Sequence, residues 1–291
     1  MIDGRKFGVE VECFNITRET LVAKMQAAGF ECFDDGYSHS ASASWKVVTD
    51  NSVQGAGSRT GSTHLGCELV SPVLEGEAGL KVVARVLVLL AKWGARVNHT
   101  CGFHVHVDAA DLSIGAHRRL CANYVKHEAL LDALVPTHRR GQGNSYCRTM
   151  NTKGDAAATM RSINKAQSLD DLACAVNPGW SEGNTQQGRY RKLNLCAFWR
   201  HGTVEFRQQG GPSEEEAGMG GTAVPAAEWL AWARLCVAMV CSAKRAVTKE
   251  NAKREGRSYR LQGNLAEFWA NFVGDARVAN HYRARLEAVE P

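Results

Sequence analysis

The sequence of 291 residues contains no uninterrupted run of the roughly 18 apolar residues that a membrane-spanning helix requires. An arginine interrupts each of its two longest apolar segments, 82–91 and 229–241. The chain starts with MIDGRKFGVEVE, which carries acidic residues early and lacks the apolar stretch of a secretory signal. We therefore expect a cytoplasmic protein that does not span a membrane.

Paired cysteines are also absent. The ten cysteines are spread from 13 to 241, and none of them forms a Cys-x-x-Cys motif. A disulfide framework belongs to short secreted chains, and a structural zinc site based on thiols needs paired cysteines, so both are excluded. With 44% hydrophobic residues, only 6 prolines and charges of both signs, the composition is that of a globular protein with reduced cysteines.

Neither common glycine motif for phosphate binding, the P-loop or G-x-G-x-x-G, occurs in the sequence. The net charge is only +5, which fits a small anionic substrate as well as a nucleic acid. Composition therefore does not select the partner, and any nucleotide must be held by groups other than a glycine-rich loop.

Hydrophobic periodicity predicts strands and helices along most of the chain. We expect strands at 6–14, 45–50, 67–70, 102–108, 192–198 and 203–208. We expect helices at 17–28, 77–93, 113–135, 168–176, 225–246 and 265–273, with loops over the rest of 137–188. No repeat or linker divides the chain, so we predict one domain over 1–291, with a helical C-terminal part at 225–291.

Three of the predicted strands carry unusual polar residues between their apolar ones. These are Glu10 and Glu12 in the first strand, His104 and His106 in another, and Glu205 and Arg207 in a third. A solvated sheet face normally carries Thr, Ser, Lys or Gln. Each strand alone is compatible with a solvated sheet edge, but the three together favour a site that binds metals or phosphates.

The glutamates on this face require a cation, because buried carboxylates without compensation cost several kcal/mol. Carboxylate oxygens with an imidazole and open positions suit Mg²⁺ or Mn²⁺. Glu68, at the end of a predicted strand, is a fourth candidate carboxylate. Arg207 adds a fixed positive charge, and Arg189 and Arg191 are close enough in sequence to reach the same place, as expected for a site that grips phosphate groups.

Five segments together resemble the ordered motifs of the putative amidoligase family, whose catalytic core is similar to those of glutamine synthetase and glutamate–cysteine ligase. The segments are 7–12, 50–53, 68–72, 101–107 and 202–207. They occur in the family's order between about residue 6 and residue 210, and a helix containing Trp229 and Trp232 follows. The resemblance implies an α+β fold: a curved, mainly antiparallel sheet with a concave active-site face and helices packed behind it, as in the catalytic domain of glutamine synthetase.

The resemblance also implies roles for individual residues. The implied metal ligands are Glu10, Glu12, Glu68, His104 and Glu205. The implied contacts to the nucleotide and acyl phosphate are His106, Arg189, Arg191 and Asn194, with Arg207 at the transferred phosphoryl group. Asp50 would orient or deprotonate the attacking amine, and the alternative that it only forms a turn stays open.

The implied activity is that of an ATP-dependent carboxylate–amine ligase. ATP would phosphorylate a small-molecule or peptide-linked carboxylate, and an amine would displace phosphate to form an amide, with Mg²⁺ or Mn²⁺ as metal cofactor. Segments 51–66 and 139–148 are candidate lids that would keep water from the acyl phosphate. The chain is much shorter than glutamine synthetase and lacks its ring-forming N-terminal domain, so no oligomeric state is predicted.

Two other functions remain as alternatives. The basic segment 244–260 would suit a nucleic-acid-binding or modifying protein, although the glutamate-rich strands repel phosphate unless metals intervene. A ligase whose carboxylate or amine belongs to a polymer would combine both features. A cupin-like metal oxygenase would use His104 and His106, but it needs a glutamate soon after the second histidine, where this chain has Asp108 and Asp111.

Overall fold

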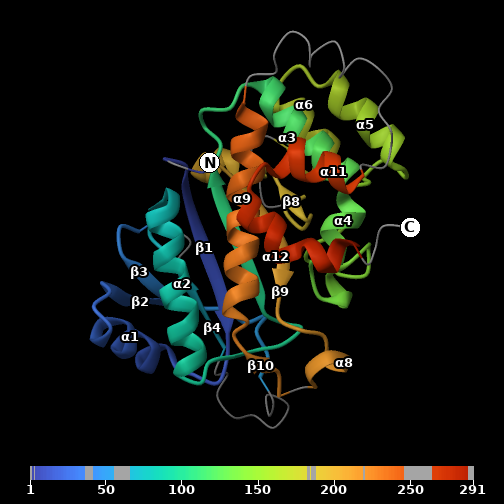
Figure 1. Ribbon diagram of the computed structural model, residues 1–291. Coiled ribbons are helices and arrows are strands. Elements are labelled where there is room, and N and C mark those ends of the chain that lie inside the picture. The colour runs from blue at the N-terminus through green and yellow to red at the C-terminus, as the bar shows by residue number, and fades with distance from the viewer. Residues whose placement is uncertain are drawn as a thin grey trace.

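A computed structural model describes residues 2, 4–36, 42–55, 66–181, 184, 188–218, 220–245 and 264–287. Most of the predicted lid 51–66 and all but the first two residues of the basic segment 244–260 lie outside these residues. Figure 1 shows a central sheet with helices in front of it and beyond both of its ends.

An eight-stranded open sheet forms the centre of the fold, in the order β2-β3-β4-β1-β7-β9-β8, with β5 paired to β1. The pairs are antiparallel except for the parallel pair β2–β3, so the predicted α+β class is confirmed and the sheet is mixed. The strands are β1 (Lys6–Cys13), β2 (Cys32–Gly36), β3 (Trp45–Thr49), β4 (Cys67–Val70), β5 (Leu74–Glu75), β7 (Gly102–Asp108), β8 (Leu193–Asn194) and β9 (Thr203–Gly210). A separate two-stranded sheet joins β6 (Arg96–Val97) to β10 (Thr222–Ala223).

The apolar face of the sheet packs against two long helices, α2 (Gly76–Lys92) and α9 (Ala226–Lys244), which cross in front of it in Figure 1. Alternate residues of β1 and β7, such as Val9 and Val105, are buried in this core. Phe103 of β7 stacks on Trp229 of α9 with ring centroids 4.8 Å apart. Because side chains alternate along a strand, this packing leaves the intervening charged residues on the opposite face.

Helix α9 is long and apolar enough to cross a membrane by length and composition, but 61% of that stretch is buried inside the protein. Arg234, in its middle, forms a bidentate ion pair with Glu77 of α2. Both observations fit a core helix packed on a sheet, in agreement with the prediction that the chain does not span a membrane.

Side-chain caps define the starts of two helices. Thr17 caps α1 (Arg18–Ala27) by accepting a hydrogen bond from Thr20, and Ser168 and Asp171 form a capping box at α6 (Leu169–Val176). The remaining helices are α3 (Ile114–Lys126), α4 (Glu128–Ala133), α5 (Ala156–Lys165), α7 (Phe198–His201), α8 (Glu214–Ala217), α11 (Leu265–Glu267) and α12 (Ala276–Glu287), with the short 3₁₀ turn η2 (Thr137–Arg139) and the π-helix η3 (Phe268–Val273).

The prediction of one helix over 113–135 is wrong, because the helix breaks at His127 between α3 and α4. The His127 ring is only 2% exposed and packs between Phe268 and Phe272, with centroids 5.3 and 5.6 Å away. Its backbone leaves helical geometry at φ −109°, ψ 15°. Packing against a segment about 140 positions later therefore ends the helix, a constraint that local periodicity does not contain.

We expect His127 to make folding stability depend on pH. Burial, aided by Lys126, lowers the pKa of His127 to about 4 in the folded protein, whereas in the unfolded chain its pKa is about 6.5. The unfolded state therefore binds more protons between these values, so stability is retained above pH 6.5 and falls as the pH drops toward 4. From pH 7 to 4.5 this histidine should remove about 2 kcal/mol.

Urea unfolding of the parent and His127→Leu at pH 7 and pH 4.5 measures this effect. The variant should lose about 2 kcal/mol less than the parent over that range, because only the parent contains the buried imidazole. The difference between the two proteins cancels the titration of the other histidines. Equal losses would contradict the assignment.

Two other sequence predictions need correction. The segment 137–188 contains α5 in addition to the predicted α6; Asp155 caps α5 by accepting from Ala158. The strand predicted at 192–198 is only the two-residue β8, after which the chain forms α7. Helix α7 ends at Gly202, whose φ of +68° suits glycine, and this turn leads directly into β9.

Candidate active site

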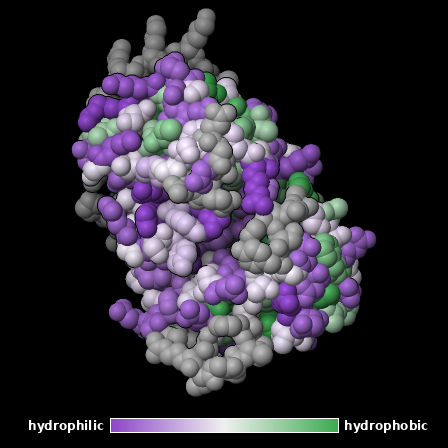
Figure 2. Space-filling model, turned by 180° about the vertical axis from the view of Figure 1, so that it is seen from behind, coloured by the Kyte–Doolittle hydropathy of each residue, from purple (hydrophilic) through white to green (hydrophobic). Residues whose placement is uncertain are grey.

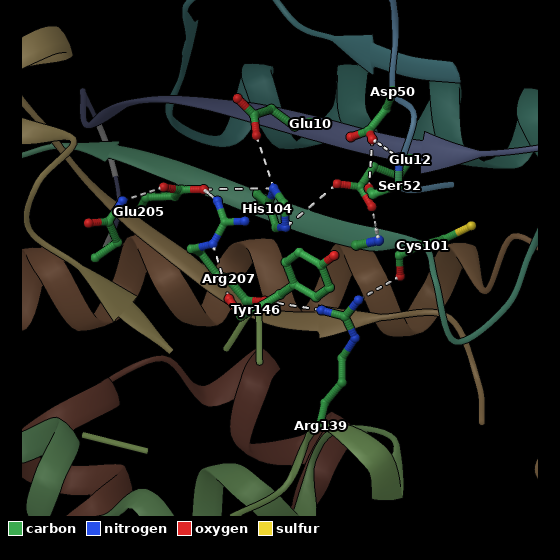
Figure 3. Close-up of polar contacts among 12 residues, drawn as sticks. Glu10, Glu12, Asp50, Ser52, Cys101, His104, Arg139, Tyr146, Glu205 and Arg207 are labelled. Carbon is green, nitrogen blue, oxygen red and sulfur yellow. Dashed lines mark hydrogen bonds and ion pairs between the residues drawn. The ribbon is translucent and has the colours of Figure 1, made fainter. Parts of the chain in front are cut away.

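The register of the sheet brings the predicted charged residues together on the face opposite α2 and α9. Strand β1 lies between β4 and β7, so Glu10 is opposite His104 and Glu12 is opposite Glu68. Strand β9 follows β7, and His106 is opposite Glu205. Figure 3 shows Glu10, Glu12 and His104 side by side, with Glu205 and Arg207 next to them.

The histidines and glutamates contact one another directly. His104 Nδ1 lies 3.0 Å from Glu10 Oε2, and His106 Nε2 lies 3.3 Å from Glu10 Oε1. Glu205 Oε1 lies 3.7 Å from a nitrogen of each histidine. One ligand atom each from Glu10, His106 and Glu205 lie within 4.8 Å of one another, which is close enough for a shared metal ion.

A β-bulge shapes the site between β7 and β9. The pairing shifts by one residue between Val105↔Phe206 and Phe103↔Gln209, so β9 carries an extra residue opposite His104. Arg207 lies in this bulge, and its guanidinium pairs with Glu205 and donates from Nε to the carbonyl oxygen of Tyr146 at 3.4 Å. Asn194 of β8 donates to the other oxygen of Glu205 at 2.7 Å.

Strand β7, which carries the two histidines, begins with Gly102 for a steric reason. Its N–H donates to Glu12 Oε2 at 2.5 Å, and a Cβ at this position would lie 2.5 Å from His104 Nε2. Only a residue without a side chain lets the strand approach both groups. The glycine therefore helps to fix the two predicted metal ligands.

The electrostatics of the cluster show competing effects of burial and charge. Burial, together with the neighbouring Glu10 and Glu12, raises the pKa of Glu68 well above its usual value, and burial also raises that of Glu12. Burial also acts to raise the pKa values of Glu10 and Glu205, but His106 and His104 together, joined at Glu205 by Arg207, outweigh it and lower both pKa values. Burial opposes the charged form of His106, yet the two glutamates raise its pKa.

This donor set fits a divalent metal ion. Four glutamates lie close together on this face of the sheet, and burial, together with Glu10 and Glu12, holds the carboxyl group of Glu68 toward its neutral form. A bound divalent cation would replace this repulsion with coordination, and oxygen-rich sets with one or two imidazoles suit Mg²⁺ or Mn²⁺. The residues that could hold it are Glu10, Glu12, Glu68, His104 and Glu205, with His106 close by.

A cavity of about 690 Å³ opens over this face of the sheet. Figure 2, which shows the side opposite α2 and α9, has hydrophilic residues gathered around a central hollow. All but one of the predicted site residues line the cavity: Glu10, Glu12, Asp50, Glu68, His104, His106, Arg189, Asn194, Glu205 and Arg207. Arg191 does not; its guanidinium donates to the carbonyl oxygen of Thr149 at 2.8 Å, so we correct its expected position in the site.

Asp50 lines the cavity and also forms a turn. Its Oδ1 accepts hydrogen bonds from the backbone nitrogen and the hydroxyl of Ser52, at 2.7 and 2.6 Å. Both hydrogen bonds of this turn use Oδ1, so the turn leaves the second carboxylate oxygen of Asp50 for a role at the cavity, and the two interpretations of Asp50 are compatible.

The segment 139–148, predicted as a lid, has Arg139 and Cys147 buried near its two ends.

Sequence reasoning missed several charged residues at the cavity. Lys46 of β3 and Arg200 and His201 of α7 line it, and the His201 ring contacts the edge of His106 with centroids 5.9 Å apart. Arg139 lies behind the site, 4% exposed, and donates to the carbonyl oxygens of Cys101 at 3.0 Å and Arg207 at 3.3 Å. Among these residues only Lys46, which stands between the apolar Trp45 and Val47, was marked by a local sequence pattern.

The fold and the cavity define an α+β protein with a carboxylate–imidazole site, suited to a divalent metal, on one face of a mixed sheet. The chain belongs to the family described as putative amidoligase enzyme, which it matches over residues 3–240. A sequence search finds no matching curated protein. Membership of this family indicates that the protein is a ligase.

Proposed function

We propose that this protein is an ATP-dependent carboxylate–amine ligase that forms an amide bond through an acyl phosphate. The observation that carries the proposal is the convergence of four glutamates, two histidines and Arg207 on one wall of a single cavity. The family supports a ligase, and the donor set supports the use of Mg²⁺ or Mn²⁺ to bind ATP.

In the first step, a carboxylate oxygen of the substrate attacks the γ-phosphorus of ATP and ADP leaves. The bound metal would supply charge neutralisation at the phosphate oxygens, and Glu10, Glu12, Glu68, His104 and Glu205 would hold it. Arg207, fixed between Glu205 and the Tyr146 carbonyl, would stabilise the charge on the transferred phosphoryl group. Arg189 and His106, also at the cavity, would contact the nucleotide.

In the second step, the nitrogen of an amine attacks the acyl carbon and inorganic phosphate leaves. The amine must lose a proton to become a nucleophile, and Asp50 is the carboxylate we assign to receive it. The cavity suits small-molecule or peptide-linked substrates, and enclosure by the segments around it would protect the acyl phosphate from water.

The test is a screen for ADP release over pools of carboxylates and amines, with mass spectrometry of the products. We expect a product that has the combined mass of acid and amine less one water, formed only with ATP and Mg²⁺ or Mn²⁺. Turnover without ATP, or an oxidised product, would overturn the proposal.

Replacing single metal ligands should separate the site from the fold. Glu12→Ala and His104→Ala should weaken Mg²⁺-dependent ATP binding by about 10- to 100-fold, because each removes a group that holds the metal. Calorimetric titration with ATP at several Mg²⁺ concentrations measures this, and circular dichroism checks folding. Glu75→Gln, at an exposed position that does not line the cavity, is the control. Unchanged metal dependence in both alanine variants would refute the assigned ligands.

A further inference from the structure

Tyr190 is an aromatic residue next to the candidate active site that has no part in the steps proposed above. It is half-buried and follows Arg189 directly in the sequence. The described residues that line the cavity include Arg189 and Arg207 but not Tyr190. Any influence of Tyr190 on the proposed reaction must therefore act through the residues that it contacts.

The ring of Tyr190 contacts the guanidinium groups of both arginines. Cζ of Arg189 lies 4.8 Å from the ring centroid, and Cζ of Arg207 lies 5.7 Å from it. Both distances are within the roughly 6 Å at which the face of an aromatic ring attracts a cation. Arg189 also donates from Nη2 to the hydroxyl oxygen of Tyr190 at 2.7 Å. One tyrosine thus contacts two cationic side chains of the cavity wall.

Neighbouring groups fix the ring and the backbone of Tyr190. The ring of Tyr146 packs against it edge to face, with centroids 5.7 Å apart and an interplanar angle of 81°. The backbone oxygen of Tyr190 accepts from the backbone nitrogen of Arg148 at 3.1 Å. The next carbonyl oxygen, that of Lys192 two residues on, accepts from the backbone nitrogen of Arg207 at 2.9 Å. Tyr190 is therefore a fixed support for mobile arginine side chains.

We propose that Tyr190 is a positioning residue, which holds Arg189 and Arg207 in the orientation that binds the phosphate groups of ATP. This inference rests on the proposed function. Two guanidinium groups beside one ring repel each other, and each long side chain loses rotational freedom when it binds an anion. Contact with the ring offsets the repulsion and orders both side chains before the nucleotide arrives, so that less freedom is lost on binding.

The hydroxyl and the ring of Tyr190 can be tested separately. Titration calorimetry of the full-length chain with ATP at saturating Mg²⁺ measures the affinity. Tyr190→Phe, which removes only the hydroxyl that accepts from Arg189, should weaken ATP binding by about threefold. Tyr190→Leu, which also removes the ring between both arginines, should weaken it by about tenfold. Phe33→Leu, the same kind of change at an exposed ring of β2 that does not line the cavity, should leave it unchanged.

A double-mutant cycle with Arg189→Gln shows whether Tyr190 acts through the arginines. Tyr190→Phe should cause no further loss of ATP affinity in the Arg189→Gln variant, because the hydroxyl then has no guanidinium to hold. Tyr190→Leu should still weaken binding a few-fold in that variant, because the ring also contacts Arg207. Melting temperatures by circular dichroism check that each variant is folded.

Turnover gives an independent measurement. In the ligation assay, Tyr190→Leu should raise KM for ATP and also lower kcat, because Arg189 is assigned to the nucleotide and Arg207 to the transferred phosphoryl group. A smaller fraction of folded enzyme would lower kcat alone. Parental ATP affinity in Tyr190→Leu, or equal losses from Tyr190→Phe with and without Arg189→Gln, would overturn the role of Tyr190 and leave the proposed ligase intact. A parent chain that binds no ATP with Mg²⁺ would overturn the proposed function and this inference with it.

Discussion

Glu205→Gln should reduce ATP-dependent ligation by about 1,000-fold. This is the largest effect on activity that we expect from replacing one charged side chain by an uncharged one of similar shape. Glu205 contacts four other residues of the site. It forms an ion pair with Arg207 and accepts a hydrogen bond from Asn194, and its carboxylate lies 3.7 Å from a ring nitrogen of each of the two histidines. Glutamine keeps the shape but removes the charge, so the metal loses a ligand and the buried guanidinium of Arg207 loses its partner.

A double-mutant cycle separates these two consequences. Arg207→Met alone should impair turnover while leaving the metal's effect on melting temperature in place, whereas Glu205→Gln should reduce both. If the ion pair carries the effect, the double variant Glu205→Gln/Arg207→Met should lose much less than the sum of the single losses. ADP release and Mn²⁺-dependent melting are the two measurements, with Glu75→Gln as control. Parental activity in Glu205→Gln would contradict the assigned site.

The charged face of the sheet could be predicted because a strand has a period of two. Glu10 and Glu12 alternate with buried valines, and so do His104 and His106, which fixes the face of each side chain from sequence alone. The family resemblance supplied the order of the strands' motifs. The register Glu10↔His104 and His106↔Glu205, on which the geometry depends, came only from the structure.

The groups that support this face were not predictable, because their roles arise from contacts distant in sequence. Arg139 contacts Cys101 and Arg207 across loops, and the break at His127 depends on Phe268 and Phe272. The strand β2 reads CFDDG, with two aspartates and few β-forming residues, and it is defined by its parallel pairing with β3. Local pattern carries no information about any of these contacts.

Lys192 was also missed, and it should have the largest effect on stability. Its side chain is fully buried, and Nζ lies 2.7 Å from Glu128 and 2.5 Å from Asp132. Asp132 also accepts from Gln208, which in turn accepts from Tyr124 at 2.6 Å. This network lies directly behind the candidate site, since the backbone oxygen of Lys192 accepts from the backbone nitrogen of Arg207 at 2.9 Å.

Lys192→Met should destabilise the fold by about 3–5 kcal/mol, because it leaves two carboxylates without their cation in the interior. Urea unfolding at pH 7 measures the loss. The triple variant Lys192→Met/Glu128→Gln/Asp132→Asn removes all three charges and should recover much of it, whereas Lys126→Met, which breaks the more exposed pair with Glu267, should cost less than about 1 kcal/mol. A triple variant as unstable as Lys192→Met would show that lost packing, and not the uncompensated carboxylates, accounts for the effect.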